Sequence, residues 1–353
     1  MSLRDLILDT FAAAAQPAQL GRRWDGVRVP AAAFSRLMSV EDCAGDLLVR
    51  WRELGIEDTV PTFMRDEVTR RTHERMARML AVRAQLRELL QAYRDAGIDI
   101  TLLKGAAFLA TGLRPLRPFT DLDVLVRTTD TERACVVMRS LGYASETRLG
   151  IEDHHHLPPF TRHGAVAVEL HVRTLNREPA REARDVPSIE IEPGTRVLAP
   201  TEWCWHALAH EARHHDLAGR VRGALDVVAL ASRYPQIEWA AIAARSRTAS
   251  DPIGVVARSV LRIRPDLPMH VGVGSRVRAA CATYGRERAA RGAASEKAFA
   301  AALYRIGMLA LGTDRWEHRL DPPRDRGAAA RLVPQPVLHL ATLVAIAMGR
   351  DVN

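Results

Sequence analysis

Residues 98–126 read IDITLLKGAAFLATGLRPLRPFTDLDVLV, and they say more about the fold than any other part of the sequence. Residues 98–103 and 122–126 are short apolar runs of the kind that form strands. Residues 105–111 between them predict a short helix. Pro115, Pro118 and Thr120 then predict turns leading into the second strand. The order strand, helix, strand marks the beginning of an α+β domain.

Helical patterns surround this segment. Residues 75–96 place apolar side chains three and four positions apart, and Gly97 predicts the end of that helix. Thr129, followed three residues later by Glu132, is a capping-box pattern and predicts the start of a helix through residue 141. We expect further strands at residues 143–147 and 165–172, and further helices at residues 201–217, 219–233 and 238–247.

These patterns divide the 353-residue chain into three expected regions. Residues 1–96 form an N-terminal helical region, and residues 199–353 form a C-terminal one. Residues 97–198 between them form an α+β core, a small mixed sheet with helices. No internal repeat is visible.

The composition is that of a globular protein, with 47% hydrophobic residues and 26% charged ones. The four cysteines lie far apart and form no CxxC pair, which favours reduced thiols over a disulfide framework. Asp5 and Asp9 interrupt the first apolar run, and residues 337–348 are too short to span a bilayer. We therefore expect a cytoplasmic protein with no membrane partner.

Two carboxylates stand out within the second strand, DLDVLV. Because side chains alternate along a strand, Asp121 and Asp123 share one face. Adjacent carboxylates repel, and Mg²⁺ is the usual ion that compensates them. A later strand contains Glu169, with His171 on the same face. An edge strand with a solvated acidic face is the alternative interpretation of the aspartates.

The chain has 50 cationic residues, of which only Lys104 and Lys297 are lysine. Lys104 stands at the predicted strand-to-helix turn and is followed by Gly105. A glycine at such a turn lets the backbone approach a phosphate, and the ammonium and the helix N-terminus favour its charge. Arg114 and Arg117 lie between this turn and the aspartates and suit bidentate phosphate contacts. Together these residues suit metal-assisted phosphoryl or nucleotidyl transfer.

The motifs resemble the uncharacterised nucleotidyltransferase family of the DNA polymerase β-like superfamily. Residues 98–126, HLPPF at 156–160, VELHV at 168–172 and the helical segment 202–239 carry the resemblance. It implies a polymerase β-like α+β core and transfer of an NMP from an NTP, expected to be ATP, to an acceptor hydroxyl with release of pyrophosphate. The acceptor, a small molecule, a peptide or RNA, is not identified by the motifs.

The resemblance also implies roles for individual residues. Asp121, Asp123 and Glu169 would bind two Mg²⁺ ions, with Mn²⁺ as a substitute, and Glu169 is also a candidate general base. The nucleotide would contact four residues: Lys104, Gly105, Arg117 and His171. The serine of the superfamily's Gly-Ser turn is absent, which leaves hydrolysis of the NTP without transfer as an alternative.

Other interpretations come from other parts of the chain. A non-catalytic nucleotide sensor on the same fold is one. Residues 210–214 read HEARH and match the HExxH motif of zinc hydrolases, without the flanking residues typical of that class. Ten arginines and three acids in residues 241–291 suggest contact with RNA or, more simply, solvated helix faces. The run His154–His156 suggests contact with a metal or a substrate phosphate or, more simply, a solvated loop with His156 turned toward the active site. Asp226 is expected either to face the catalytic cleft or to cap a neighbouring helix.

Overall fold

The computed structural model describes residues 2–145, 156–175, 185–213, 220–245 and 253–269. The chain divides into two compact units. The first consists of residues 1–42, 211–224 and 243–353, and the second of residues 43–210 and 225–242.

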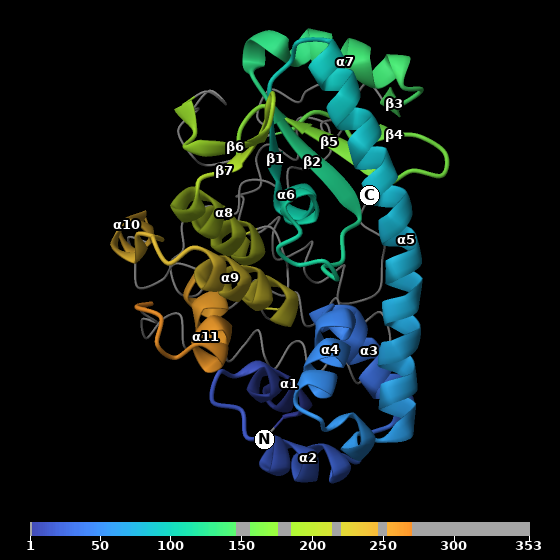
Figure 1. Ribbon diagram of the computed structural model, residues 1–353, viewed down its shortest axis with the longest axis vertical. Helices are drawn as coiled ribbons and strands as arrows, with labels where there is room; N and C mark the ends of the chain where they lie inside the picture. The colour runs from blue at the N-terminus through green and yellow to red at the C-terminus, as the bar shows by residue number, and fades with distance from the viewer. Residues whose placement is uncertain (1, 146–155, 176–184, 214–219, 246–252, 270–353) are drawn as a thin grey trace, which may run out of the picture. The chain divides into compact units, whose positions relative to one another are not determined.

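The second unit is built on a mixed sheet with the strand order β3-β4-β5-β2-β1-β7-β6 (Figure 1). β2 pairs antiparallel with β1 and parallel with β5, and β1 pairs parallel with β7. β2 and β1 are therefore central strands. The seven strands are β1 (Ile100–Leu103), β2 (Asp121–Val126), β3 (Ala144–Ser145), β4 (Phe160–Thr161), β5 (Ala167–His171), β6 (Ser188–Glu192) and β7 (Thr195–Leu198).

The central strands explain the apolar stretch around residue 100. All four residues of β1 are buried, and in β2 every residue after Asp121 is buried. Such a strand reads as a continuous apolar run because both of its faces are covered. The helix α6 (Lys104–Thr111) follows β1 without a loop and packs against β1 and β2 (Figure 1). The predicted order strand, helix, strand is confirmed.

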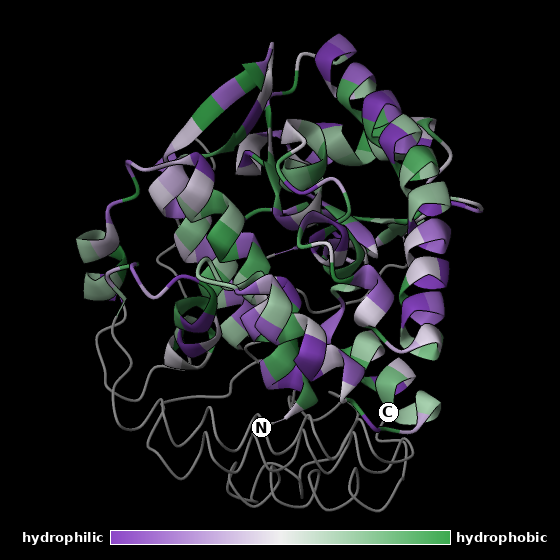
Figure 2. Ribbon diagram, turned by 60° about the horizontal axis from the view of Figure 1, so that its bottom comes forward, coloured by the Kyte–Doolittle hydropathy of each residue, from purple (hydrophilic) through white to green (hydrophobic). Residues whose placement is uncertain are grey.

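Helices complete the second unit. They are α4 (Ala44–Glu53), α5 (Thr62–Asp95), α7 (Thr131–Ser140), and parts of α8 (Pro200–Arg213), α9 (Val221–Arg233) and α10 (Trp239–Arg245), with 3-10 turns η1 (Glu57–Thr59) and η2 (Thr128–Asp130). At 34 residues, α5 begins well before the predicted start at residue 75. Its first turns are rich in charged residues, and Figure 2 shows hydrophilic and hydrophobic residues mixed along its length. Because charged residues interrupt the apolar spacing in these first turns, hydrophobic periodicity predicted a helix that is too short.

Two predictions of secondary structure were wrong or incomplete. The capping box does not form, because Thr129 lies in η2 and α7 begins at Thr131, with Asp130 before it and no side-chain cap. The hairpin of β6 and β7 was not predicted at all. The predicted helices 201–217 and 219–233 correspond to α8 and α9, although residues 214–219 lie outside the described residues.

The first unit contains α1 (Leu3–Phe11), α2 (Pro17–Asp25), α3 (Ala31–Glu41) and α11 (Ile253–Ile263). A fully buried carboxylate, Glu41, organises it. Glu41 accepts a hydrogen bond from Arg4 at 3.0 Å and another from the backbone N–H of Val221 at 2.8 Å. A buried charge needs such partners, and these bonds tie α1 and α3 to the start of α9.

The described residues thus form a mixed α/β protein with eleven α-helices and a seven-stranded mixed sheet. All seven strands lie within residues 97–198, the segment expected to form the α+β core. The arrangement is compatible with a nucleotidyltransferase core. None of the described helices is both long enough and apolar enough to cross a membrane.

Candidate functional site

Strand register brings the acidic residues together. In the parallel pair of β2 and β5, Asp123 lies opposite Glu169, and on the other side of β2 it lies opposite Leu103 of β1. Lys104 follows Leu103 directly. The motifs that lie far apart in the sequence therefore meet at one place on the sheet.

The side chains of this place form a tight charged cluster. Lys104 Nζ lies 2.5 Å from Asp123 Oδ1 and 3.7 Å from Glu169 Oε2. His171 Nε2 lies 2.9 Å from Asp123 Oδ1 and 3.6 Å from Glu169 Oε2. The side chains of Asp123 and His171 are fully buried, whereas that of Glu169 is 19% exposed. Glu169 is therefore the most exposed member of the cluster, ahead of Lys104 at 12%.

The charges of the cluster stabilise one another. Burial alone would raise the pKa of Asp123, but the Lys104 ammonium and the hydrogen bond from His171 hold that pKa well below its usual range. Burial would likewise lower the pKa of Lys104, but the carboxylates of Asp123 and Glu169 raise it. Burial would also raise the pKa of Glu169, but the hydrogen bond with His171 and the Lys104 ammonium lower it. Both carboxylates and the ammonium are therefore ionised at neutral pH.

A metal ion would fit this cluster. Ligand atoms of Asp123, Glu169 and His171 all lie within 4.8 Å of one another. Among the described residues, this is the one group of three or more His, Cys, Asp or Glu side chains that could hold a metal ion. Asp123 Oδ2 is buried and has no hydrogen-bond partner in the described part of the chain. A buried carboxylate oxygen without a partner is costly, and a hard divalent cation would satisfy it.

Asp121 lies outside this group of three. It sits on the same strand face, opposite Ala167, and is partly buried. Burial and, after it, the neighbouring Asp123 carboxylate raise the pKa of Asp121 to about 6. Asp121 therefore carries the least stabilised charge of the three acids that the sequence singled out.

Lys104 adopts an unusual backbone conformation. Its φ is +43°, a left-handed value that residues with a Cβ seldom adopt. The residue is both the first of α6 and the one that follows β1, so the strained turn directs its side chain to the cluster. Non-glycine residues in this conformation tend to lie at functional sites, where the surrounding structure holds them.

Gly105 and Arg117 lie next to each other, as the phosphate-binding interpretation requires. A Cβ on Gly105 would come within 2.9 Å of Arg117 Nη1 and within 2.9 Å of Phe119 Cβ. The glycine thus allows residues 117–119 to pack directly on the first turn of α6. This packing is a structural reason for the glycine that the sequence did not reveal.

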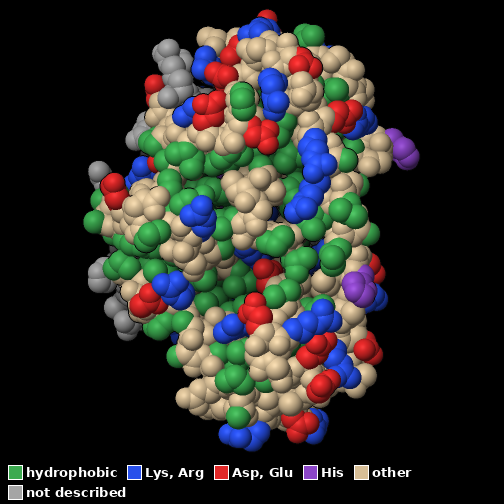
Figure 3. Space-filling view, viewed as in Figure 1, with side chains coloured by type: hydrophobic (Ala, Val, Ile, Leu, Met, Phe, Trp, Pro, Cys, Tyr) green, Lys and Arg blue, Asp and Glu red, His purple; other side chains and the backbone are tan. Residues whose placement is uncertain are grey.

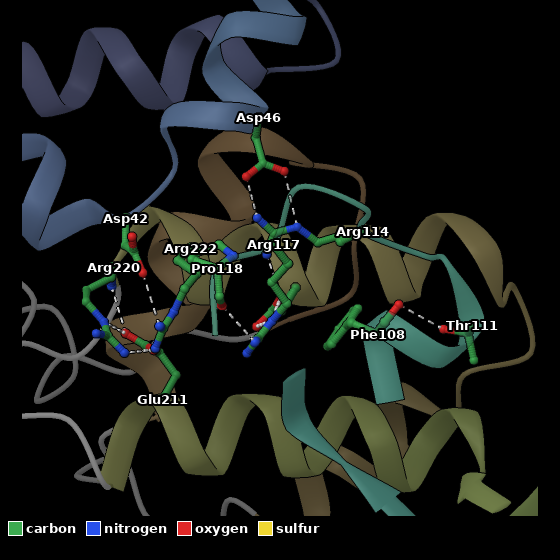
Figure 4. Close-up of polar contacts among 11 residues, drawn as sticks. Asp42, Asp46, Phe108, Thr111, Arg114, Arg117, Pro118, Glu211, Arg220 and Arg222 are labelled. Atoms are coloured by element: carbon green, nitrogen blue, oxygen red, sulfur yellow. Dashed lines mark hydrogen bonds and ion pairs between the residues drawn. The ribbon is translucent and has the colours of Figure 1, made fainter. Parts of the chain in front are cut away.

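Asp226, which the sequence left either facing the cleft or capping a helix, lies beside the arginines of the candidate site. Its carboxylate on α9 accepts from Arg117 Nε at 2.8 Å and also pairs with Arg114 Nη1. Arg114 is buried and forms a second ion pair with Asp46 of α4, in which Arg114 Nη2 lies 2.7 Å from Asp46 Oδ2 (Figure 4). The signal was present in the sequence, since Asp226 is the only charged residue in the apolar run ALDVVAL.

Two histidines also lie at the cluster. His156 forms an isolated β-bridge with His171, and their ring centroids are 5.3 Å apart. His206 of α8 is fully buried, and burial together with the charges of Lys104 and His171 lowers its pKa to about 3. The sequence connected His156 and His206 with the family pattern, and for His156 it also offered a loop position turned toward the active site. His154 and His155 lie outside the described residues.

The glutamate of the HExxH motif, Glu211, forms a structural ion pair. Glu211 accepts hydrogen bonds from Arg220 Nε at 3.0 Å and from Arg220 Nη2 at 2.9 Å. This bidentate ion pair is visible in Figure 4. A carboxylate held in this way is poorly suited to activate a water molecule. His214, the second histidine of the motif, lies outside the described residues.

The basic stretch 241–291 is described only in part. Within it, Arg262 pairs with Asp5 and Asp9 of α1, and Arg264 pairs with Asp266. Figure 3 shows basic and acidic side chains interspersed on the visible face. In the described part, these pairings favour solvated and ion-paired helix faces; residues 270–291 lie outside it.

Comparison with known proteins gives one match. Residues 30–250 match a family model described as "Uncharacterised nucleotidyltransferase". The matched segment is more than half of the chain and contains every residue of the cluster. Searches of curated proteins and of solved structures returned no match.

Proposed function

This chain belongs to the uncharacterised nucleotidyltransferase family, and we propose that it transfers an NMP from an NTP, with ATP the expected donor, to a hydroxyl group of an acceptor. The observation that carries the proposal is the buried Asp123 beside Glu169 at the Lys104–Gly105 turn. A divalent cation, Mg²⁺ or Mn²⁺, is the expected cofactor.

The cation would be held by the carboxylates of Asp123 and Glu169. The unpartnered Oδ2 of Asp123 and the partly exposed carboxylate of Glu169 supply hard oxygen ligands. His171 is hydrogen-bonded to Oδ1 of Asp123, which fixes the orientation of that carboxylate. When bound, such a cation polarises a phosphoryl oxygen and offsets the charge of the phosphates.

The triphosphate would bind beside the Lys104–Gly105 turn. An ammonium has three donors, and only one of those of Lys104 is taken up by the short bond to Asp123. Arg117 stands next to Gly105 and is oriented by Asp226. Two fixed positive charges would then face the phosphates, a common way to stabilise phosphoryl transfer.

The reaction is a single displacement at the α-phosphorus. The acceptor oxygen forms a bond to that phosphorus, and the bond from the phosphorus to the bridging oxygen of the β-phosphate breaks, so that pyrophosphate leaves. The acceptor's proton passes to one of the partly exposed carboxylates, Glu169 or Asp121. The chain's contribution is to align these groups and to balance their charge.

The test is release of pyrophosphate from Mg²⁺–NTP in the presence of cell extract as the source of acceptor. We expect Asp123→Asn to reduce release by at least two orders of magnitude, by analogy with the loss of other groups that stabilise transition-state charge, on the order of 10²–10³-fold. Asp99→Asn is the matched control, because Asp99 is an exposed carboxylate in the same unit, paired with Arg127.

Binding of Mg²⁺–NTP by the wild type with no release of pyrophosphate under any acceptor condition would favour a nucleotide sensor instead. Equal release by the wild type and Asp123→Asn would rule out the proposed site.

A further inference from the structure

The two oxygens of the Asp123 carboxylate have different surroundings. Oδ1 contacts Lys104 Nζ at 2.5 Å and His171 Nε2 at 2.9 Å. Oδ2 is buried and has no hydrogen-bond partner among the described residues. One oxygen is thus covered by an ammonium and an imidazole, and one is left for a cation.

This division matters for the number of ions that the site accepts. In two-metal sites the ions lie about 3.5–4 Å apart, and a shared carboxylate commonly gives one oxygen to each. Asp123 is the fully buried carboxylate at the centre of the cluster. While Lys104 occupies Oδ1, Asp123 has only Oδ2 to offer.

Lys104 is held in this position by more than its charge. Its side chain is only 12% exposed, and its ammonium lies between the carboxylates of Asp123 and Glu169, 3.7 Å from the latter. Its backbone is in the left-handed conformation at the junction of β1 and α6. The low exposure of the side chain and its two carboxylate neighbours both favour the observed position of the ammonium.

We propose that the site takes one divalent cation per chain and that the Lys104 ammonium occupies the place of a second, as a fixed positive charge between the carboxylates and the phosphates. This inference rests on the proposed function and replaces the two ions that the family resemblance implied. Lys104 thereby becomes a part of the cation site as well as a phosphate-binding residue.

The test counts bound Mn²⁺ by equilibrium dialysis with a saturating nucleotide whose α,β-bridge is a methylene group, so that no transfer occurs. Free Mn²⁺ is read from its electron paramagnetic resonance signal, and labelled nucleotide is counted in the same cell. The variants are Lys104→Ala and, as the matched control, Lys297→Ala, the other lysine in the chain. Circular dichroism checks that each variant is folded.

We expect one Mn²⁺ per bound nucleotide in the wild type and in Lys297→Ala, and two in Lys104→Ala, where the vacated position accepts a second ion. Two ions in the wild type, or one in a folded Lys104→Ala, would overturn the inference and leave the proposed function standing. If Lys104→Ala does not fold, the wild-type count alone decides. A wild type that binds no nucleotide would overturn the proposed function as well.

Discussion

At Lys104, backbone conformation and side-chain charge act together. A left-handed φ of +43° is unfavourable for lysine, and the ammonium is largely buried. Both costs are offset by the contacts with Asp123 and Glu169. A residue that only filled space would relax to an ordinary conformation.

Lys104→Arg tests whether a compact ammonium is required. A planar guanidinium is larger and presents its donors in a fixed fork, so it cannot take the 2.5 Å position of Nζ on Asp123 without displacing the turn. We expect kcat/KM for the NTP to fall on the order of 100-fold, measured by pyrophosphate release. Near-normal kcat/KM would mean that any cation serves at this position.

Asp121 yields a prediction about pH. Its pKa, raised to about 6 in the folded protein, exceeds its ordinary value of 3.8. Ionisation therefore costs folding free energy: the contribution of Asp121 to stability is intact below about pH 4 and is lost as the pH rises through 6. Asp121→Asn, which cannot ionise, should be more stable than the wild type at pH 7.5, by on the order of 1–3 kcal/mol.

Chemical denaturation in EDTA measures this difference, since a bound cation would stabilise the wild-type carboxylate. The advantage of the variant should shrink towards zero at pH 4. An advantage that does not change with pH would show that the substitution acts through packing and not through the charge.

Residues of the site differ in how far the sequence could predict them. That Lys104, Asp123 and Glu169 lie close together was predictable, because their positions on short strands and a turn indicate one edge of the sheet. Asp226 was not, because its partners Arg114 and Arg117 are more than a hundred residues away in the sequence, and only the fold shows which cations it meets.

At the scale of elements, the first turn of α6 and residues 117–119 form one packed unit. A Cβ on Gly105 would meet Arg117 and Phe119 at 2.9 Å. We expect Gly105→Ala to lower the free energy of unfolding by about 1–3 kcal/mol, measured by chemical denaturation. Gly26→Ala is the control, because the nearest atom there, the backbone oxygen of Arg22, lies at 3.4 Å.

If Gly105→Ala loses no more stability than Gly26→Ala, residues 117–119 move aside freely.

The ion pairs of Arg114 and Arg117 connect α4 and α9 to the loop before β2. Asp46→Asn and Asp226→Asn each remove one partner of the buried Arg114, so both should lose roughly 1–3 kcal/mol of stability. Only Asp226→Asn also releases Arg117. We therefore expect KM for the NTP to rise on the order of tenfold or more in Asp226→Asn, with kcat less affected, and to stay near the wild-type value in Asp46→Asn.

Equal KM values in the two variants would show that Asp226 does not orient Arg117 towards the nucleotide.

Among the elements, the central strands were predictable and the edge hairpin was not. β1 and β2 are buried on both faces and read as apolar runs. β6 is largely exposed, and its alternation of Ser, Ile and Glu gives a weak signal. The turn at Pro193 and Gly194 was the available clue, since this dipeptide is typical of a tight turn between strands.

At the scale of the whole molecule, ion pairs account for much of the basic composition. Nearly every cation is arginine, and in the described residues many arginines pair with acids within their own unit, as Arg4 does with Glu41 and Arg114 with Asp46. Arginine suits such pairs because its planar fork matches a carboxylate. The net charge of +8 is the excess that remains after every acid is counted, and a net charge by itself does not identify a nucleic-acid partner.

The acceptor is the property that the sequence reveals least. The motifs of the site lie on strands, whose side chains alternate between two faces, and on a turn that contains a glycine. Their residue types indicate phosphate chemistry. An acceptor would be recognised by the shape of a surface built from several helices, which residue types and spacing do not determine.

Transfer of label from an NTP is the most direct measurement of the central claim. Cell extract with the purified protein and Mg²⁺ receives NTP labelled at the α-phosphate in one sample and at the γ-phosphate in another. We expect the α-label to appear on an acceptor and the γ-label to leave as pyrophosphate, both lost with Asp123→Asn and retained with Asp99→Asn. Appearance of the γ-label on the acceptor, or absence of the α-label from it, would contradict nucleotidyl transfer.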